Sequence, residues 1–376
     1  MKYFLSKESV LKSLEIPSVY HMKKDDLYEL DETSFAFLMR CASREGCVSN
    51  DREFVDFCIS EGILTPEKPA LQRPPVLHAH VPSLRYLELQ ITNRCNLRCR
   101  HCYIDVKERS ELSVSEIRAV LTQFQEMQGL RVLITGGEPL LHKGFFELNE
   151  MLPDFFLRKV LFTNGVLKDS GILKKLNVEE LQVSIDGLED AHDSLRGHGT
   201  FRAAMKTVRN ALDTGIEVSV STMVHAENLG DFERMDTLFR EAGIKDWTVD
   251  IPCRTGRMAE NHEWGVTPEE AGQYFRFGFG EGLHAGAEGF GCGLHLAAVM
   301  ADGKVAKCTF FGETAVGTIR DGLSVCWDRI QPVVLAELEC DCNHIEACRG
   351  GCRYRALLLG DPMGKDLYKC AYYGKM

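Results

Sequence analysis

The sequence has no long apolar run. No stretch approaches the roughly 20 consecutive apolar residues that a membrane-spanning helix needs. The first residues, Met1–Glu8, carry charged side chains too early to supply the apolar centre of a secretory signal. We therefore expect a cytoplasmic protein with no membrane partner.

Positive charge is also scarce. Lys and Arg number 44 against 55 Asp and Glu, which gives a formal net charge of −11. Nothing in the chain resembles the basic stripe of a nucleic-acid-binding surface, so nucleic acid is not an expected partner. Peptides or small metabolites suit this charge better.

Cysteine, in contrast, is abundant, with 15 residues. Because the cytoplasm keeps thiols reduced, this number favours metal ligation over disulfides. Ten of the cysteines fall into two groups, three of them within 95–102 and seven, Cys326 not included, within 292–370. The others have no motif around them and read mostly as small apolar core residues: Cys41, Cys47, Cys58, Cys253 and Cys326. Cys253 follows a predicted strand and could approach the active-site face.

The first group has the spacing CxxxCxxC over Cys95, Cys99 and Cys102. Three closely spaced thiolates without a nearby fourth leave one corner of a four-iron cluster for a small-molecule ligand. Zinc is the main alternative, but a structural zinc site takes four ligands, commonly as two separated pairs. The spacing therefore favours an iron–sulfur cluster with one open iron.

Further motifs follow apolar runs downstream, at Gly136–Pro139 (GGEP), Thr163–Gly165 (TNG) and Ser184–Gly187 (SIDG). With the cysteine loop and its histidine, His101, they stand in the order typical of the radical S-adenosylmethionine (SAM) superfamily, which the chain resembles. The resemblance implies that the three cysteines are the catalytic cluster ligands. It also implies that SAM chelates the open iron and is cleaved to a 5′-deoxyadenosyl radical.

The resemblance assigns further residues to SAM. Gly136 and Gly137 let backbone approach the cofactor closely, and Glu138 places a negative charge near its amino group. Asn164 and Tyr103 are also counted among the cofactor-binding residues. An ordinary turn is the alternative interpretation of the glycine pair.

Two further SAM contacts are assigned near the fourth predicted strand. Ser184 and Asp186 are placed at the ribose hydroxyls, and Arg196 at the methionine carboxylate, which suits a guanidinium fork. The alternatives are a simple strand end for Asp186 and a solvated loop position for Arg196. Asp250 and Arg254 lie near the predicted mouth of the barrel, where charged residues need no catalytic role.

Strand-like apolar runs alternate with amphipathic helical stretches along the middle of the chain, which predicts an α/β fold with a parallel sheet. The six runs are 84–91, 132–135, 160–163, 181–185, 218–224 and 247–251, and the helical stretches include 113–127, 201–214 and 231–242. Each motif lies at a strand end, where α/β barrels carry their active sites. The resemblance implies an open, partial (β/α)6 TIM-like barrel over residues 84–285 that admits a large substrate.

The second cysteine group lies within residues 286–376. It comprises Cys292, Cys308, Cys340, Cys342, Cys348, Cys352 and Cys370. The spacing resembles the SPASM domain of radical SAM peptide-modifying enzymes, which implies two auxiliary four-iron clusters in addition to the SAM-binding cluster. The family's interleaved ligation assigns Cys292, Cys308 and Cys352 to the first cluster and the other four to the second. The first cluster then has either an open iron or a fourth ligand from elsewhere.

One spacing departs from that family. Cys340–Asp341–Cys342 stands where CxxC is usual, and the tighter loop puts in doubt whether both thiols bind the same cluster. A four-cysteine zinc site is the alternative for this segment.

Residues 1–68 are expected to form a separate small domain. Alternating runs at 18–22 and 27–30 predict a hairpin, and helices are expected over 32–42 and 51–61. The order resembles the winged-helix-like RiPP recognition element, which implies binding of an extended leader peptide as an added strand. The alternative is a segment that merely packs on the barrel.

The proline-rich residues 69–83 are expected to be a semi-rigid linker. Its two histidines, His78 and His80, are interpreted as solvated spacer residues and not as metal ligands.

Three functions are compatible with these patterns. The first is a radical SAM/SPASM maturase that forms a thioether or carbon–carbon crosslink, or another oxidative change, in a ribosomal precursor peptide, with ferredoxin or flavodoxin as electron donor. The second modifies an intact protein, as sulfatase or metalloenzyme maturases do, or a tetrapyrrole side chain. The third is a non-catalytic iron–sulfur or peptide-binding adaptor, which would have no need for a complete SAM site.

Overall fold

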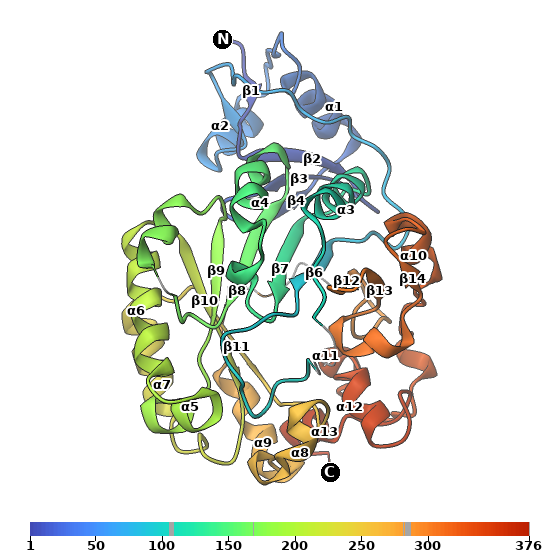
Figure 1. The fold of residues 1–376 in the computed structure, drawn as a ribbon. Helices are drawn as coiled ribbons and strands as arrows, with labels where there is room; N and C mark the ends of the chain where they lie inside the picture. Colours follow the sequence, from blue (N-terminus) through green and yellow to red (C-terminus); the bar gives the residue numbers. More distant parts are fainter. Residues whose placement is uncertain (105–108, 168, 281, 283–286, 376) are drawn as a thin grey trace.

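A computed structural model describes residues 1–104, 109–167, 169–280, 282 and 287–375. Within this part of the chain, nine strands form the central sheet (Figure 1). Six are parallel and adjacent in chain order: β6 (Tyr86–Thr92), β7 (Arg131–Gly136), β8 (Arg158–Thr163), β9 (Glu180–Ser184), β10 (Glu217–Met223) and β11 (Asp246–Asp250). Each overlaps one predicted strand, so the α/β class and the mostly parallel sheet are confirmed.

The sheet continues past β6 with residues of the C-terminal region. β12 (Leu296–Val299) pairs in parallel with β6, and β13 (Lys304–Ala306) and β14 (Gly317–Thr318) follow as antiparallel strands. The C-terminal cysteine-rich region is therefore joined to the barrel through backbone hydrogen bonds, an extension that the cysteine pattern alone did not predict.

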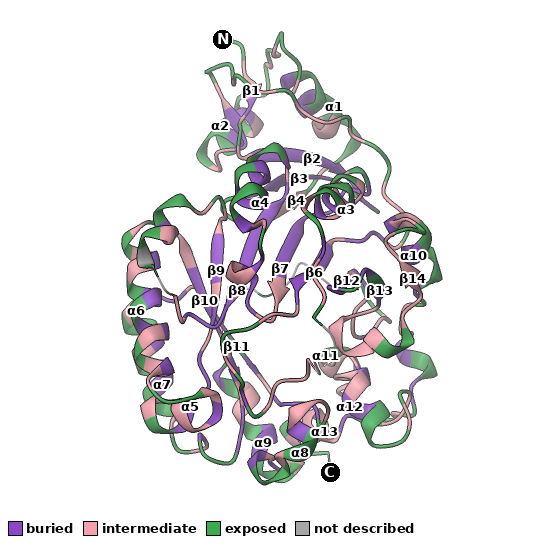
Figure 2. Ribbon diagram, in the orientation of Figure 1, coloured by how far each residue is buried: buried purple, intermediate pink, exposed green. Residues whose placement is uncertain are grey.

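Helices cover the outer face of the parallel strands (Figure 1). They are α3 (Val114–Glu126), α4 (Phe145–Met151), α5 (Glu189–Arg196), α6 (Thr200–Asp213) and α7 (Phe232–Ala242). Ser113 begins α3 in a capping box with Glu116, and the buried side chains of α3 recur at helical spacing: Ile117, Val120, Leu121 and Phe124. Figure 2 shows the strands buried beneath helices whose outer surfaces are exposed.

The remaining elements are short. After β11 come α8 (Arg257–Glu260), α9 (Pro268–Ala271), α10 (Leu323–Arg329), α11 (Ile345–Cys348), α12 (Arg353–Leu358) and α13 (Leu367–Tyr372). Single 3-10 segments lie at Pro139–Leu141, Leu152–Asp154, Ser170–Lys175, His262–Trp264, Gly272–Phe277, Thr309–Thr314 and Leu335–Glu337. Among the described helices, none is long and apolar enough to cross a membrane.

The N-terminal region has its own small sheet and core. The antiparallel sheet contains β2 (Ser9–Ser13), β3 (Pro17–His21) and β4 (Asp26–Glu29), in that order. A second pair joins β1 (Phe4–Leu5) to β5 (Leu64–Thr65), and the helices are α1 (Glu32–Cys41) and α2 (Arg52–Ser60). The predicted hairpin is β3 and β4. The predicted pattern omitted β2, whose residues are all buried and so do not alternate.

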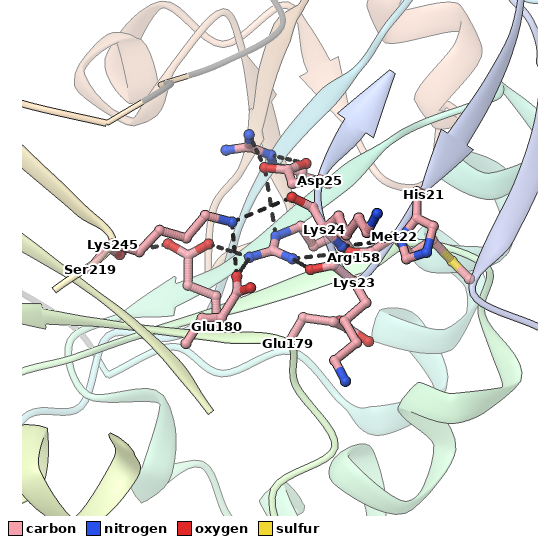
Figure 3. Close-up of polar contacts among 12 residues, drawn as sticks. His21, Met22, Lys23, Lys24, Asp25, Arg158, Glu179, Glu180, Ser219 and Lys245 are labelled. Carbon is pink, nitrogen blue, oxygen red and sulfur yellow. Dashed lines mark hydrogen bonds and ion pairs between the residues drawn. The ribbon is translucent and has the colours of Figure 1, made fainter. Parts of the chain in front are cut away.

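An ion-pair cluster fastens this region to the starts of the barrel strands (Figure 3). Arg158, fully buried at the first position of β8, donates to the carbonyls of Met22 and Lys23 at 3.0 and 2.6 Å and to Glu180 at 2.7 Å. Arg131, which begins β7, donates through Nε to Asp25 at 2.8 Å. The turn between β3 and β4 therefore packs on the end of the barrel opposite the strand ends that carry the motifs.

The linker packs on its neighbours. His78 Nδ1 lies 2.9 Å from the Ser13 hydroxyl, and His80 Nδ1 lies 2.9 Å from an Asp328 carboxylate oxygen. Arg73 donates to the Ser9 carbonyl at 2.6 Å. His78 is exposed and His80 is half-buried, which agrees with their interpretation as spacer residues, and each also makes one hydrogen bond that helps to hold the linker in place.

Candidate functional site

A cavity of about 780 Å³ opens at the carboxyl ends of the parallel strands. Its lining combines the three loop cysteines with residues from the ends of neighbouring strands and from the C-terminal region. Predicted residues in this lining are Cys95, Cys99, Cys102, Tyr103, Gly136, Gly137, Asn164, Ser184 and Arg196. The fold thus brings nine of the eleven residues assigned to the cluster and SAM to one cavity.

The cysteine loop is held from two sides. Arg100 donates its backbone N–H to the Leu195 carbonyl at 3.0 Å, which ties the loop to the end of α5. On the other side, Arg257 donates through Nε to the Cys99 carbonyl at 2.8 Å and through its backbone to the Cys102 carbonyl at 2.9 Å. The loop is thus positioned without any contribution from a bound group.

The three thiols suit an iron–sulfur cluster. Burial raises the pKa of Cys99 to about 11 and also raises that of Cys95, so these thiols would release protons as they bind metal. Arg196 Nη1 lies 3.9 Å from Cys99 Sγ, and Asn164 Nδ2 lies 3.7 Å from Cys95 Sγ. Positive charge and an amide donor beside the sulfurs stabilise thiolates.

The donor set is chemically suited to an iron–sulfur cluster, because such clusters are held by cysteine thiolates. Across the described ranges, no three His, Cys, Asp or Glu side chains are close enough together to hold one metal ion.

Asp186 lies behind the cavity and not in its lining. Its side chain is fully buried, accepts from Nε of Arg196 and from the Met223 N–H at 2.7 Å, and lies 3.6 Å from His101 Nε2. Burial is the largest single effect and works against its charge, but Arg196 acts together with neighbouring groups, including the Met223 N–H, and the net result is a lowered pKa of Asp186. The predicted contact of Asp186 with the SAM ribose stays a prediction; in this structure the carboxylate holds Arg196 and lies beside His101 of the cysteine loop.

His101 is neutral in this arrangement. Burial lowers its pKa to about 3, although Asp186 opposes that shift. Its Nε2 is 3.4 Å from Arg196 Nη2, and its buried Nδ1 has no hydrogen-bond partner among the described groups. The histidine therefore packs beneath the cysteine loop as part of the Arg196–Asp186 cluster.

The glycine pair is required by backbone packing. A Cβ at Gly136 would lie 2.2 Å from the Thr92 carbonyl oxygen, and one at Gly137 would lie 2.4 Å from that of Arg94. These contacts are too short for any other residue type. Glycine lets the end of β7 lie directly against the start of the cysteine loop, in addition to the predicted approach to the cofactor.

Glu138 is buried beside the cavity wall. Its carboxylate accepts from the Thr163 hydroxyl at 3.0 Å and from the Asn164 backbone N–H at 2.9 Å. Burial raises its pKa to about 7. Glu138 is not among the described residues that line the cavity. Its predicted contact with the SAM amino group therefore stays a prediction.

Tyr103 and Ser184 do line the cavity. Gln90 Nε2 donates to the Tyr103 hydroxyl at 3.2 Å, and the Tyr103 ring centroid is 4.8 Å from that of Phe310. Phe310 belongs to the C-terminal region. Tyr103 therefore joins the cysteine loop to that region at the edge of the cavity.

The four cysteines assigned to the second auxiliary cluster surround a separate cavity of about 480 Å³. They are Cys340, Cys342, Cys348 and Cys370. The Cys342 sulfur also accepts from the His344 N–H at 3.4 Å. The tight Cys340–Asp341–Cys342 spacing therefore still presents both thiols to the same space, and the residues fit a cluster.

The first auxiliary group also comes together. Cys292, Cys308 and Cys352 lie close enough that charge on one thiol raises the pKa of its neighbours, a shift that adds to the larger effect of burial on Cys292 and Cys308. Glu88 of β6 lies beside them, because its Oε2 accepts from the Thr309 N–H at 3.0 Å. This group thus adjoins the main cavity, which Glu88 and Thr309 line.

Three residues of the site were not predicted. Gly256 and Arg257 clamp the cysteine loop, and a Cβ at Gly256 would lie 2.6 Å from the Cys102 carbonyl oxygen. Glu88 contributes a carboxylate to the cavity from within a predicted strand. A glycine soon after the sixth strand was the only available signal for the clamp, and Glu88 stands among apolar neighbours with no motif.

Comparison with known proteins agrees with the chemistry of the cysteine loop. The radical SAM superfamily model matches residues 89–239. An AdoMet-dependent heme synthase of Oleidesulfovibrio alaskensis is 29% identical over 209 residues, which cover 54% of this chain and 54% of that protein. This chain therefore spans about half the length of that relative.

Two further proteins resemble a larger share of the chain. The mycofactocin maturase MftC of Mycolicibacterium smegmatis is 25% identical over 315 residues, covering 74% of this chain and 80% of that protein. The crystal structure of Streptococcus suis SuiB bound to precursor peptide SuiA superimposes with a TM-score of 0.67 at 14% identity, over 98% of this chain and 100% of that chain. The second likeness is one of fold.

Proposed function

The chain carries a radical SAM domain over residues 89–239, and from this premise we propose that it is a radical SAM/SPASM maturase of a ribosomally made peptide. The observation that carries the proposal is the set of three thiol groups: the cysteine loop and the first auxiliary group beside one cavity of about 780 Å³, and the second around its own cavity. Ten thiols held in this way suit three four-iron clusters.

The chemistry of the main cavity follows from its groups. When bound, the loop cluster and SAM supply a reduced centre and a 5′-deoxyadenosyl radical that takes hydrogen from the substrate. The protein's own residues hold the cluster ligands in place and offset their negative charge. Arg196 offsets thiolate charge at Cys99, Asp186 fixes Arg196, and the clamp at Arg257 keeps the loop in register.

Glu88 is the carboxylate best placed to move a proton in the cavity. Burial raises its pKa, and the Thr309 N–H fixes one of its oxygens. An acid whose pKa is raised toward neutrality suits proton transfer. We assign Glu88 as the base that accepts a proton from the substrate during crosslinking or a related oxidation.

A peptide substrate is supported by the N-terminal region. Its small sheet has β4 as an edge strand, whereas Arg73 and the linker cover part of β2. An edge strand offers backbone donors and acceptors to an extended peptide. We assign residues 1–68 as a RiPP recognition element-like domain that binds the leader, with a cytoplasmic location and ferredoxin or flavodoxin as electron donor.

Tetrapyrrole modification is the second candidate. Its support is the likeness of the barrel to an AdoMet-dependent heme synthase, at 29% identity over 54% of the chain. A separate domain with an open sheet edge has no evident use with a tetrapyrrole, so the peptide is favoured.

The test is anaerobic incubation of the reconstituted protein with SAM, a reductant and short peptides encoded beside its gene, followed by mass spectrometry of the peptide. Loss of two hydrogens per event is expected and identifies the modified residues. An epimerisation would leave the mass of the peptide unchanged, so a deuterium-exchange measurement is made to detect it. Abundant 5′-deoxyadenosine with a peptide unchanged by both measurements would contradict the peptide assignment and direct the assay to iron coproporphyrin.

A further inference from the structure

A fourth thiol lies beside the first auxiliary group. Cys253 follows β11, is 4% exposed, and makes a side-chain hydrogen bond with Cys352. No sequence motif surrounds it.

Neighbouring contacts hold the two cysteines together. Arg355, three residues after Cys352, donates to the Asp250 carboxylate at 2.5 Å and to the Ile251 carbonyl at 3.3 Å. The Tyr354 hydroxyl donates to that of Thr255 at 3.4 Å. The start of α12 is thereby fastened to the segment on both sides of Cys253.

Arg355 is itself fixed. It is 5% exposed and also donates to the buried Asp366 carboxylate through Nη2 at 2.9 Å. A buried arginine between two carboxylates is costly to displace, because either acid would be left without its counter-charge. The contact between the two thiols is therefore maintained by a fixed connection between α12 and the segment that carries Cys253.

The other two thiols of the group approach the same point. The Cys292 sulfur accepts a hydrogen bond from the backbone of Arg353, the residue after Cys352. Phe310, two residues after Cys308, stacks on the Tyr354 ring with centroids 5.3 Å apart. Both chain segments thus pack on the first turn of α12, from which Cys352 projects.

We propose that Cys253 is the fourth ligand of the first auxiliary cluster, together with Cys292, Cys308 and Cys352. The proposal rests on the proposed function, because it presumes that the auxiliary groups bind four-iron clusters. Each thiol gives its proton to solvent as its sulfur–iron bond forms, so ligation needs no oxidant. The cluster then has no open iron.

Cys326, another cysteine without a motif, has different surroundings. Cys326, in α10, is also buried, but its thiol donates to the Thr318 carbonyl at 3.4 Å and no other cysteine contributes to its pKa. It is a matched control, since it shares burial with Cys253 and lacks the neighbouring thiols.

A closed cluster restricts the chemistry at the main cavity. With four protein ligands the first auxiliary cluster cannot bind a substrate thiol or amide directly. Its role is then electron transfer, and its position beside Glu88 and Phe310 places it near the substrate space. Phe310 also contacts the ring of Tyr103, which directly follows the cysteine loop. These two aromatic rings therefore lie between the first auxiliary group and that loop.

The test uses the full chain with Cys95, Cys99 and Cys102 changed to Ala, which leaves only the auxiliary clusters. About eight irons per chain are expected after reconstitution. Adding Cys253→Ala should open one iron, so that mild oxidation releases it and gives the EPR signal of a three-iron cluster. Added ¹³C-cyanide should couple to the cluster in that variant only. The control substitution Cys326→Ala should neither cause loss of iron on mild oxidation nor allow ¹³C-cyanide to couple to the cluster.

Cys253→Ser separates ligation from folding, because a serine oxygen can hold the iron. This variant should keep the four-iron form with an altered Mössbauer spectrum. If Cys253→Ala resists iron loss and cyanide as its parent does, Cys253 is not a ligand and the inference is wrong. If the parent itself binds no iron, the auxiliary clusters of the proposed function are wrong instead.

Discussion

Arg196 lies with Nη1 3.9 Å from the sulfur of Cys99 while its Nε donates to the Asp186 carboxylate. Burial disfavours the guanidinium charge, but Asp186 together with the Cys99 and Cys102 thiols raises the pKa of Arg196. A permanent positive charge therefore stands beside the central thiol of the cysteine loop. Through Arg196, the Asp186 carboxylate behind the cavity therefore influences the charge around the Cys99 thiol in the cavity lining.

The Asp186→Asn substitution tests that relationship. It leaves Arg196 buried without a counter-charge, so the free energy of unfolding should fall by about 3–5 kcal/mol. Iron bound at the cysteine loop should fall with it. Chemical denaturation and iron analysis measure both. Glu189→Gln, which removes only an exposed pair with Arg202, should change stability by less than about 1 kcal/mol. Full iron retention in Asp186→Asn would contradict the positioning role.

Gly137→Ala should disrupt the cysteine loop. The new Cβ would lie 2.4 Å from the Arg94 carbonyl oxygen, so the loop must move away from β7. We expect loss of most of the iron bound by this loop, and of 5′-deoxyadenosine formation. Gly230→Ala is the matched control, because a Cβ there meets no atom within 4 Å. Equal iron content in the two variants would show that the close packing is not required.

Glu88→Gln separates radical formation from product formation. If Glu88 accepts a substrate proton, the modified peptide should decrease by about 100-fold or more while SAM cleavage continues. Liquid chromatography of 5′-deoxyadenosine and mass spectrometry of the peptide provide the two readouts. Glu260→Gln is the control, since Glu260 lines the same cavity but is exposed. Parallel loss of both products in Glu88→Gln would point to a structural role.

Arg158→Met should loosen the N-terminal region. The substitution leaves Glu180 and Glu217 without their buried partner, at a cost of about 3–5 kcal/mol. Limited proteolysis within 69–83 should become faster, and leader binding should lose its effect on turnover. Arg240→Met, which breaks an exposed pair with Asp236, should leave proteolysis unchanged.

Lys12 should make stability depend on pH. Burial lowers the pKa of this lysine, which donates to the Gly129 carbonyl at 2.6 Å, from 10.5 to about 7. Between pH 7 and 10.5 the unfolded chain holds a proton that the folded chain lacks, so stability should rise with pH, by a few kcal/mol (on the order of 1.4 kcal/mol per pH unit). Unfolding midpoints of the wild type and of Lys12→Met measure the difference, and Lys12→Met should lack this part of the rise.

The barrel could be predicted from sequence because its signals are local. Each strand of the parallel sheet is a short apolar run, and α3 shows its cap and its buried face within 14 residues (113–126). The cysteine loop is equally local. Glycine at 136 and 137 was correctly singled out, although its strongest reason, contact with the Thr92 and Arg94 carbonyls, needs two strands to be placed together.

The rest depends on contacts between distant segments. Asp186 follows a strand end, but its ion pair with the arginine ten residues later could not be read from that position alone. β2 is buried on one face by the core of the N-terminal region, at Leu11, and on the other by the barrel, at Val10, so it lacks the alternation that marks a surface strand. Cys253 and Cys352 are 99 residues apart, and only α12 brings them into contact.

The docking of the N-terminal region at Arg158 also sets the distance between that region and the main cavity. β8 begins at Arg158 and ends at Thr163 beside the cavity, a rise of about 17 Å at 3.3 Å per residue. Under the proposed function, a peptide bound at the β4 edge would have to extend over at least that distance before any of its residues could reach the cavity. Roughly the first five extended residues after the bound segment would therefore lie too close to β4 to be modified.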